Sequence, residues 1–383
     1  MCSMTAFPFR FTSVFAACVA SAVLVACGDD GLSDSQPLTP RSSVVLDGFI
    51  QPGLTLVPDS GGSTQRIALG APNEFDAGSF DVRNDTAVAA SSRGAGDLLY
   101  IASLATGSVR RVQMPTRGNP ARARLLRATD GQALLGVPLR DNGALALVRL
   151  SVNTSTTGSI GDLGACPVDV FQYDGDLWVV DANAACATDY RPLGSMRLIR
   201  VPAGGGARQV IALDVLRGSD AGVVVQGDVA YISAGGDADF SSFPYRLLVG
   251  GAITRVDLRT RTVLGTRPMP TGTYGASTRL GLDGQLHVSL FEDLTNFRSR
   301  TISYRLPDLT PTGTRIAASD FLALRDAAGA QVSCGSSIAD GTGRWHCIQN
   351  RTGSATFLMI FAPDGSLVRE VAAGQGGVDL RFR

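Results

Sequence analysis

The chain has 383 residues with 34 basic and 34 acidic side chains, so its formal net charge is zero. A neutral chain has no general attraction to nucleic acid, which excludes binders that rely on a basic surface. Its 45 glycines and its aromatic content of 7% are typical of a β protein rich in turns.

Residues 1–26 are predicted to be a lipoprotein signal peptide. Arg10 provides the positive charge, and the apolar run Phe11–Ala26 is too short to span a membrane. The run ends in Leu-Val-Ala-Cys, which resembles the lipobox of bacterial lipoproteins, so Cys27 is expected to carry a lipid anchor. No aspartate follows Cys27 directly, which favours the outer membrane by analogy with enteric bacteria. The alternative is an ordinary signal peptide with an incidental cysteine.

Residues 27–45 are polar and contain Pro, Ser, Asp and Gly, a composition typical of a flexible tether. Residues 46–383 are predicted to form one domain, because a strand–turn–strand pattern recurs along them at intervals of about 43 to 56 residues. The seven copies start at Leu54, Asp97, Ala144, Met196, Ala252, Thr301 and Ala355.

A second, more apolar hairpin lies between consecutive copies. Its clearest examples are Val168–Ala182, Gly222–Gly236 and Thr278–Glu292. Two of them contain Asp-Gly dipeptides, Asp174-Gly175 and Asp283-Gly284, which suit a two-residue turn whose central residues both have positive φ. Each period therefore provides four antiparallel strands, as a blade of a β-propeller does. A β-sandwich is the alternative.

The pattern predicts an all-β fold, a β-propeller of seven four-stranded blades, with six or eight blades as alternatives. The final strand, Val378–Arg383, has no hairpin partner, and little strand sequence precedes the first copy. We therefore expect the C-terminal strand to complete the first blade. Closure of this kind removes an open sheet edge that would invite pairing with other chains.

The four cysteines after residue 27 flank two predicted hairpins almost symmetrically. The expected disulfides are Cys166–Cys186 and Cys334–Cys347. Disulfides indicate an oxidising compartment, in agreement with a cell-envelope location. Four free buried thiols are the alternative.

No catalytic motif stands out in the sequence. The only histidines are His287 and His346, no CxxC spacing occurs, and His287 alternates with apolar residues as a packed histidine between blades would. Asp237 and Asp239 could begin a calcium loop, but the third carboxylate and the downstream glutamate are missing, so a polar loop is the simpler interpretation. We expect no metal and no cofactor.

Three connections between the second and third strands of neighbouring blades are unusually long. Long loops in a compact domain are usually functional or disordered, and Tyr, Phe and Arg are typical of binding surfaces. The predicted binding residues are Tyr190, Arg191, Asp237, Asp239, Phe240, Phe243, Tyr245, Phe297 and Arg298. We expect them to recognise a protein or glycan partner in the cell envelope.

The turns resemble those of bacterial β-propellers of the YVTN, NHL and PQQ-like repeat families. The shared features are the DGxLxV patterns at Asp174–Val179 and Asp283–Val288 and the Thr-Gly turns at residues 106–107 and 157–158. The resemblance covers residues 45–383 and implies the fold rather than an activity. These families include lactonases, lyases, quinoprotein dehydrogenases and scaffolds.

Two departures from those families bear on function. The metal-binding carboxylates of lactonases cannot be placed on this chain, and the repeated Trp-containing motifs of quinoprotein dehydrogenases are missing. We therefore predict a membrane-anchored binding or scaffold protein. The alternative is a hydrolase or lyase of the propeller lactonase type, with its site at the mouth of the central channel.

Overall fold

The computed structural model describes residues 40–383 except 49, 73, 94–95, 129–131, 151–154, 219–220, 242, 295–297, 313–323 and 333. The predicted signal peptide, Cys27 and most of the predicted tether lie outside these residues. No helix in the described part of the chain is long and apolar enough to cross a membrane.

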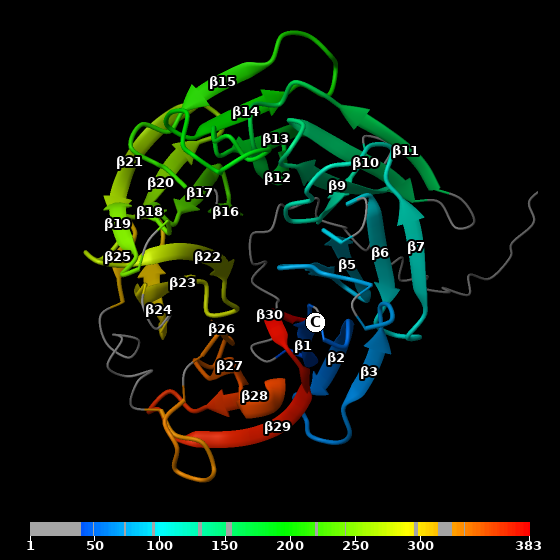
Figure 1. The fold of residues 1–383 in the computed structure, drawn as a ribbon, viewed down its shortest axis with the longest axis vertical. Helices are drawn as coiled ribbons and strands as arrows, with labels where there is room; N and C mark the ends of the chain where they lie inside the picture. Colours follow the sequence, from blue (N-terminus) through cyan, green and yellow to red (C-terminus); the bar gives the residue numbers. More distant parts are fainter. Residues whose placement is uncertain are drawn as a thin grey trace, which may run out of the picture.

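Seven four-stranded antiparallel sheets surround a central axis, as Figure 1 shows in a view along that axis. The predicted seven-bladed β-propeller is confirmed. From the outermost strand inwards, blade 1 contains β3 (Gln65–Ala68), β2 (Gly53–Pro58), β1 (Ser42–Asp47) and β30 (Gly377–Phe382). Blade 2 contains β7 (Val109–Gln113), β6 (Leu98–Ser103), β5 (Thr86–Ser91) and β4 (Asp81–Arg83). Blade 3 contains β11 (Ser155–Ile160), β10 (Ala144–Leu150), β9 (Ala133–Leu139) and β8 (Arg124–Arg127).

The other four blades follow the same order around the ring. Blade 4 contains β15 (Gln209–Ala212), β14 (Arg197–Val201), β13 (Asp176–Asp181) and β12 (Pro167–Tyr173). Blade 5 contains β21 (Thr262–Pro268), β20 (Ala252–Asp257), β17 (Val229–Ala234) and β16 (Ala221–Gln226). Blade 6 contains β25 (Thr310–Pro311), β24 (Arg298–Arg305), β23 (Leu286–Asp293) and β22 (Tyr274–Leu280). Blade 7 contains β29 (Leu367–Gln375), β28 (Ala355–Phe361), β27 (Trp345–Asn350) and β26 (Ser336–Ala339), with the short helix η1 (Thr352–Ser354) between β27 and β28.

The ring is closed by the C-terminal strand, as the sequence predicts. β30 is the innermost strand of blade 1 and pairs antiparallel with β1, with Leu46 opposite Asp379 and Ser43 opposite Phe382. β1 begins at Ser42, so it extends across the predicted domain boundary at residue 46. The two ends of the described chain therefore meet in one sheet.

The apolar core is divided among the spaces between neighbouring sheets. One cluster joins blades 1 and 2 through Leu46, Phe80 and Tyr100, and the largest joins blades 4 and 5 through Trp178 and Val225. Both faces of a blade are covered by its neighbours, so a strand such as β1 is buried at all six positions instead of alternating.

Both predicted disulfides are present. Cys166–Cys186 and Cys334–Cys347 join Cα atoms 5.6 and 5.4 Å apart, within the ordinary range for a disulfide. The first connects the start of β12 to the long connection between β13 and β14. The second joins β27 to the residues just before β26.

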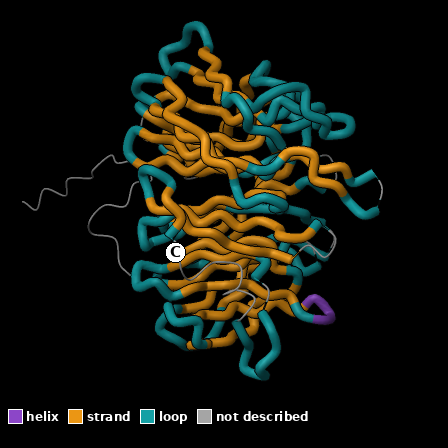
Figure 2. The backbone as a smooth tube through the Cα atoms, turned by 90° about the vertical axis from the view of Figure 1, so that its left-hand side faces the viewer, coloured by secondary structure: helices purple, strands orange, loops and turns teal. Residues whose placement is uncertain are grey.

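The two ends of the ring differ in the length of their connections. We call one end the loop face; it carries the connections between the second and third strands of each blade and those between blades. The opposite end, the turn face, carries the short turns within hairpins. Figure 2 shows the ring from the side, with η1 and a projecting two-stranded hairpin on the loop face. This hairpin, β18 (Asp237–Asp239) and β19 (Arg246–Val249), is inserted between β17 and β20 of blade 5.

Candidate functional site

The inserted hairpin presents a cluster of aromatic side chains on the loop face. Phe240 packs edge-to-face on Tyr245, with ring centroids 5.2 Å apart, and on Tyr274 at 5.4 Å. Phe243 contacts Tyr245 in the same way at 5.7 Å and remains 69% exposed. Because Tyr274 belongs to the innermost strand β22, the cluster extends from the tip of the hairpin towards the axis of the ring.

The base of the hairpin is fixed by glycines. The amide of Gly275 donates to the carbonyl of Gly235 over 3.0 Å, and a Cβ at Gly235 would lie 2.4 Å from the Cα of Gly275. Only residues without side chains allow blades 5 and 6 to approach this closely. The amide of Gly236, whose φ is +89°, donates to the carbonyl of Arg217, which ties the hairpin to the connection from blade 4.

The long connection of blade 4 is ordered by local bonds. The Cys166–Cys186 disulfide anchors it, and the carboxylate of Asp189 accepts hydrogen bonds from the Thr188 hydroxyl and the Arg191 amide. The hydroxyl of Tyr190 accepts a 2.7 Å bond from the side-chain amide of Asn119, which belongs to the connection between blades 2 and 3. Tyr190 is still 40% exposed.

Most of the predicted binding residues lie where the sequence places them. Tyr190 and Arg191 lie on the blade 4 connection, and Asp237, Asp239, Phe240, Phe243 and Tyr245 lie on the inserted hairpin. Asp237 and Asp239 occupy strand β18 instead of an open loop. Asp239 Oδ1 accepts a hydrogen bond from the Ser241 amide, and bonding to Ser241 lowers the pKa of Asp239. Phe297 lies outside the described residues, and Arg298 begins β24. Whether these residues bind a partner stays a prediction.

Exposed apolar side chains gather on the loop face. Of the eleven large hydrophobic residues that are exposed in the described part of the chain, eight belong to this face and three, Val210, Leu264 and Val368, to the outermost strands of the blades. The eight are Ile50, Tyr190, Leu193, Val215, Phe240, Phe243, Leu248 and Val378. Six of the eight lie on the connections of the neighbouring blades 4 and 5, whereas Ile50 and Val378 belong to blade 1. Single exposed hydrophobic residues need no explanation, but several on neighbouring connections indicate an interaction surface.

A second candidate region lies on the axis of the ring, where three aspartates occupy innermost strands; Asp169 and Asp379 are buried and Asp81 is partly buried. We call Asp81, Asp169 and Asp379 the axial aspartates. Each accepts a hydrogen bond from a backbone amide of the next blade: Asp379 Oδ2 from Phe80, Asp81 Oδ2 from Leu125 and Asp169 Oδ2 from Val223, over 3.4, 2.9 and 3.1 Å. Each of these bonds joins one blade to its successor at the centre of the ring.

Four arginines, which we call the axial arginines, lie beside the carboxylates of Asp169 and Asp379: Arg122, Arg124, Arg279 and Arg381. Arg124 binds Asp169 through two parallel bonds of 2.8 Å, and Arg122 Nη1 lies 3.4 Å from the same carboxylate. Arg279 in blade 6 pairs with Asp379 in blade 1, past the innermost strand of blade 7, and Arg381 Nη2 lies 3.3 Å from Asp379.

The pKa values follow from burial and these ion pairs. Burial alone would raise the pKa of Asp379, but Arg381, Arg279 and Arg122 outweigh it and lower the pKa to about 2. Burial likewise opposes ionisation of Asp169, yet Arg124 and Arg122 hold its pKa below the ordinary value. Burial lowers the pKa of Arg122 and of Arg381, because each guanidinium is removed from water.

The sequence contains a local signal for the axial aspartates. Each stands between two apolar residues at an innermost strand, in Phe80-Asp81-Val82, Val168-Asp169-Val170 and Val378-Asp379-Leu380. An aspartate inside a strand that should be fully buried requires a charged partner. The identity of that partner depends on contacts between distant blades.

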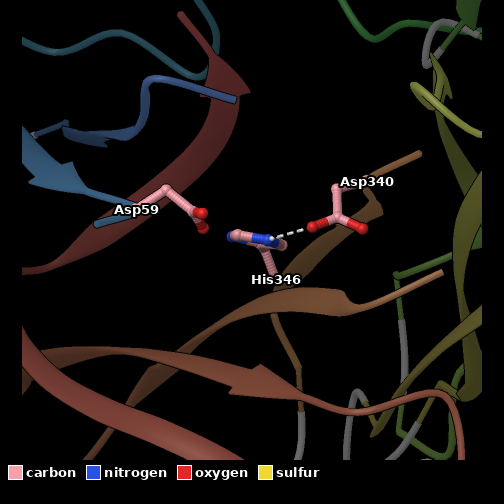
Figure 3. Close-up of side chains that lie close together, drawn as sticks. All are labelled: Asp59, Asp340 and His346. Carbon is pink, nitrogen blue, oxygen red and sulfur yellow. Dashed lines mark hydrogen bonds and ion pairs between the residues drawn. The ribbon is translucent and has the colours of Figure 1, made fainter. Parts of the chain in front are cut away.

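A third group of polar residues closes the ring on the turn face. Figure 3 shows the ring of His346 between the carboxylates of Asp59 and Asp340, whose ligand atoms lie within 4.8 Å of one another. The guanidinium of Arg344 already bridges the two carboxylates, with its Nη2 2.8 Å from Asp59 and 2.7 Å from Asp340. A divalent cation at this place would meet that positive charge, so the arrangement fits an ion-paired clamp between blades 7 and 1 better than a metal centre.

The clamp is extended by a buried serine. Ser43 Oγ is hydrogen-bonded to Nδ1 of His346 over 2.8 Å, and Nε2 of the same ring lies 3.4 Å from Asp340. Burial opposes ionisation of Asp340, but hydrogen bonds from His346, Thr342 and Arg344 prevail and lower its pKa.

A similar chain joins Ser303, His287 and Asp283 in blade 6, with distances of 2.6 and 3.0 Å from the histidine. Ser43, Ser303 and both histidines are at most 4% exposed. A nucleophile must be reachable by its substrate. These Ser-His-Asp chains therefore connect strands and blades, which agrees with the packed role predicted for His287.

Comparison with known proteins shows similarity in fold only. No family model matches the chain, and no curated protein matches it. Among solved structures, a Bacteroides fragilis protein provisionally described as a 6-phosphogluconolactonase is similar over 91% of this chain and 100% of its own, with a TM-score of 0.57 and 10% identity. An apocarotenoid oxygenase from Synechocystis covers 91% of this chain and 93% of its own, with a TM-score of 0.53 and 9% identity.

A third similar structure is the hydrazine synthase of Kuenenia stuttgartiensis, which covers 77% of this chain and 85% of its own, with a TM-score of 0.53 and 12% identity. Identities this low show a shared β-propeller fold and nothing finer. Because the three proteins carry different activities, the fold leaves the function to be argued from the surfaces and the axis of this chain.

Replacement of Asp379 tests the role of the axis. Asp379→Asn leaves Arg279 and Arg381 buried without their counter-charge, so we expect it to lower the free energy of unfolding by about 3–5 kcal/mol at neutral pH, measured by urea denaturation. The control Asp85→Asn removes an ion pair with Arg383 in which the aspartate side chain is 46% exposed, and should cost less than about 1 kcal/mol.

Acid provides a second readout for the same variant. The pKa of Asp379 is about 2 in the folded protein and ordinary in the unfolded chain, so its contribution is complete above about pH 4 and is lost as the pH falls towards 2. Asp379→Asn should be less sensitive to acid than wild type across this window. If Asp379→Asn and Asp85→Asn lowered the free energy of unfolding at neutral pH by the same amount, the result would contradict a structural role for Asp379 on the axis.

Proposed function

We propose that the protein is a lipid-anchored β-propeller of the bacterial cell envelope that recognises a protein or glycan partner through its loop face. The observation that carries the proposal is the concentration of eight of the eleven exposed large hydrophobic side chains of the described chain on that face. A soluble monomer rarely exposes such a collection unless the surface binds something.

The chemistry of the loop face supports recognition of a macromolecule. The hairpin presents the exposed rings of Phe240 and Phe243 next to the carboxylates of Asp237 and Asp239, and the blade 4 connection adds Tyr190. Aromatic rings surrounded by polar groups are typical of the centre of protein interfaces. They also suit sugars, which offer an apolar face and a rim of hydroxyl groups.

Two features support the location. The end of the predicted h-region resembles a lipobox at Cys27. The domain contains two disulfides, which form and persist in oxidising compartments such as the periplasm or the outer cell surface. We place the domain with the YVTN, NHL and PQQ-like repeat propellers on the basis of the Asp-Gly and Thr-Gly turns.

The alternative of a lactonase-type hydrolase or lyase requires reactive groups at the axis. The axis is charged rather than apolar, which keeps this alternative open. However, the three axial aspartates are bonded to backbone amides, and Asp169 and Asp379 are also paired with arginines. Carboxylates engaged in this way are poor candidates for metal ligands or general bases.

The loop-face proposal predicts contacts that can be trapped. A photo-crosslinking amino acid at Phe243 should give adducts in intact cells, whereas the same amino acid at Leu264, which is 46% exposed on β21, should give none. Combined replacement of Tyr190, Phe243 and Tyr245 by serine should abolish binding of the captured partner. Replacement of Leu264 and Val368 by serine is the matched control and should preserve it.

The outcomes separate the kinds of partner and can reject the proposal. Adducts sensitive to protease indicate a protein, and adducts sensitive to glycan-cleaving enzymes indicate a glycan. Equal adducts at Phe243 and Leu264, or unchanged partner binding by the triple variant, would show that the loop face is not the recognition surface.

The lipid anchor makes a separate prediction. Cys27→Ser should abolish incorporation of radiolabelled palmitate and move the protein from the membrane fraction to the soluble envelope fraction. The matched control is Cys18→Ser, because Cys18 lies within the predicted h-region and leaves with the signal peptide. Palmitate incorporation that survives Cys27→Ser would refute the lipobox assignment.

A further inference from the structure

The axial arginines outnumber the axial aspartates. The arginines contribute four positive charges and the aspartates three negative charges. Arg122 lies within electrostatic reach of Arg124 and Arg381, and Arg381 lies within reach of Arg279 and Arg124. Like charges brought together away from water repel strongly unless a counter-charge is present.

Two donors of Arg279 are left without an acceptor among the described residues. Arg279 is 4% exposed, yet its Nε and Nη1 have no hydrogen-bond partner among the described residues, whereas Nη2 of Arg381 is ion-paired with Asp379 over 3.3 Å. Buried N–H groups without acceptors are rare in proteins, and those on a charged group are the most costly. In contrast, the axial carboxylates accept bonds from arginines or from backbone amides.

Three of the axial arginines are not fully buried. The side chains of Arg122, Arg124 and Arg381 keep 10%, 18% and 13% of their surface accessible. Arg279 reaches from β22 in blade 6 to Asp379 on β30 in blade 1, so its guanidinium lies over the inner edge of blade 7. Water could accept bonds from these groups, but it would not balance their charge.

We propose that the axial arginines bind a small oxyanion, of the carboxylate or phosphate class, on the axis of the propeller. An oxyanion supplies the missing counter-charge and several acceptor atoms at once, and guanidinium groups bind such anions through paired N–H donors. Arg124, Arg279 and Arg381 come from innermost strands, and Arg122 stands two residues before β8.

The first test is titration of the full-length wild-type protein in detergent by isothermal calorimetry. Inorganic phosphate and acetate are used in separate arms, with ionic strength held constant by sodium chloride. We expect saturable binding of one molecule per chain in at least one arm, and the arm that binds more tightly identifies the class. Saturable binding must be accompanied by a rise in melting temperature that depends on ligand concentration. No saturable binding of either anion would overturn the proposal.

Variants locate the site. Arg279→Gln and Arg381→Gln should each weaken the affinity by about tenfold or more, because each removes charged donors. Arg197→Gln is the matched control, because Arg197 on β14 pairs with Asp181 on β13, away from the axis. This variant should bind the anion as tightly as wild type does. If Arg279→Gln does not fold, Arg122→Gln, whose contact to Asp169 is longer, replaces it. Equal affinity in wild type and in the folded axial variants would place the anion elsewhere and overturn the proposal.

Discussion

The carboxylate of Asp379 is the point on which closure of the ring depends. It lies on the last strand of the chain, accepts a bond from the Phe80 amide in blade 2 and pairs with Arg279 from blade 6. One side chain therefore fixes the C-terminal strand against the blades on either side of the closure. A buried ion pair contributes little net stability compared with apolar packing, but a mispaired one is costly, so such a contact selects one register.

The same device recurs around the axis and on the turn face. Asp81 and Asp169 bind an amide of the following blade as Asp379 does, and Arg344 bridges Asp59 in blade 1 to Asp340 in blade 7. Apolar packing between blades is not directional. Hydrogen bonds and ion pairs are directional, so these polar contacts fix the orientation of each blade relative to the next. A ring fixed in this way can carry long connections on its loop face without loss of order in the blades.

The fold could be predicted from the sequence because its elements are local. Alternating apolar residues and the Asp-Gly turns define hairpins, and cysteines placed almost symmetrically about a hairpin are brought near each other, as Cys166 and Cys186 are. The C-terminal strand could be assigned to blade 1 because an unpaired strand must find a partner.

The contacts on the axis and in the clamp could not be predicted in this way. The link from Ser43 to His346 joins residues 303 positions apart, and that from Phe80 to Asp379 joins residues 299 apart. No local pattern encodes which blade an arginine will reach. The hairpin β18–β19 was also not foreseen, because its short strands contain Asp237 and Asp239, which read as a polar loop. The predicted loop-face residues themselves were accessible to sequence reasoning, since loop length and aromatic content are local properties.

Amide hydrogen exchange followed by mass spectrometry or NMR would test most directly that the ring is locked at its axis while the loop face stays free to adapt. The amides of Phe80, Leu125 and Val223, which donate to the axial aspartates, should exchange only through global unfolding. Those of Phe240, Phe243 and Tyr245 at the hairpin tip should exchange many orders of magnitude faster. If the three axial amides exchanged as fast as the hairpin tip, the axial aspartates would not hold neighbouring blades together, and this account of the fold would be contradicted.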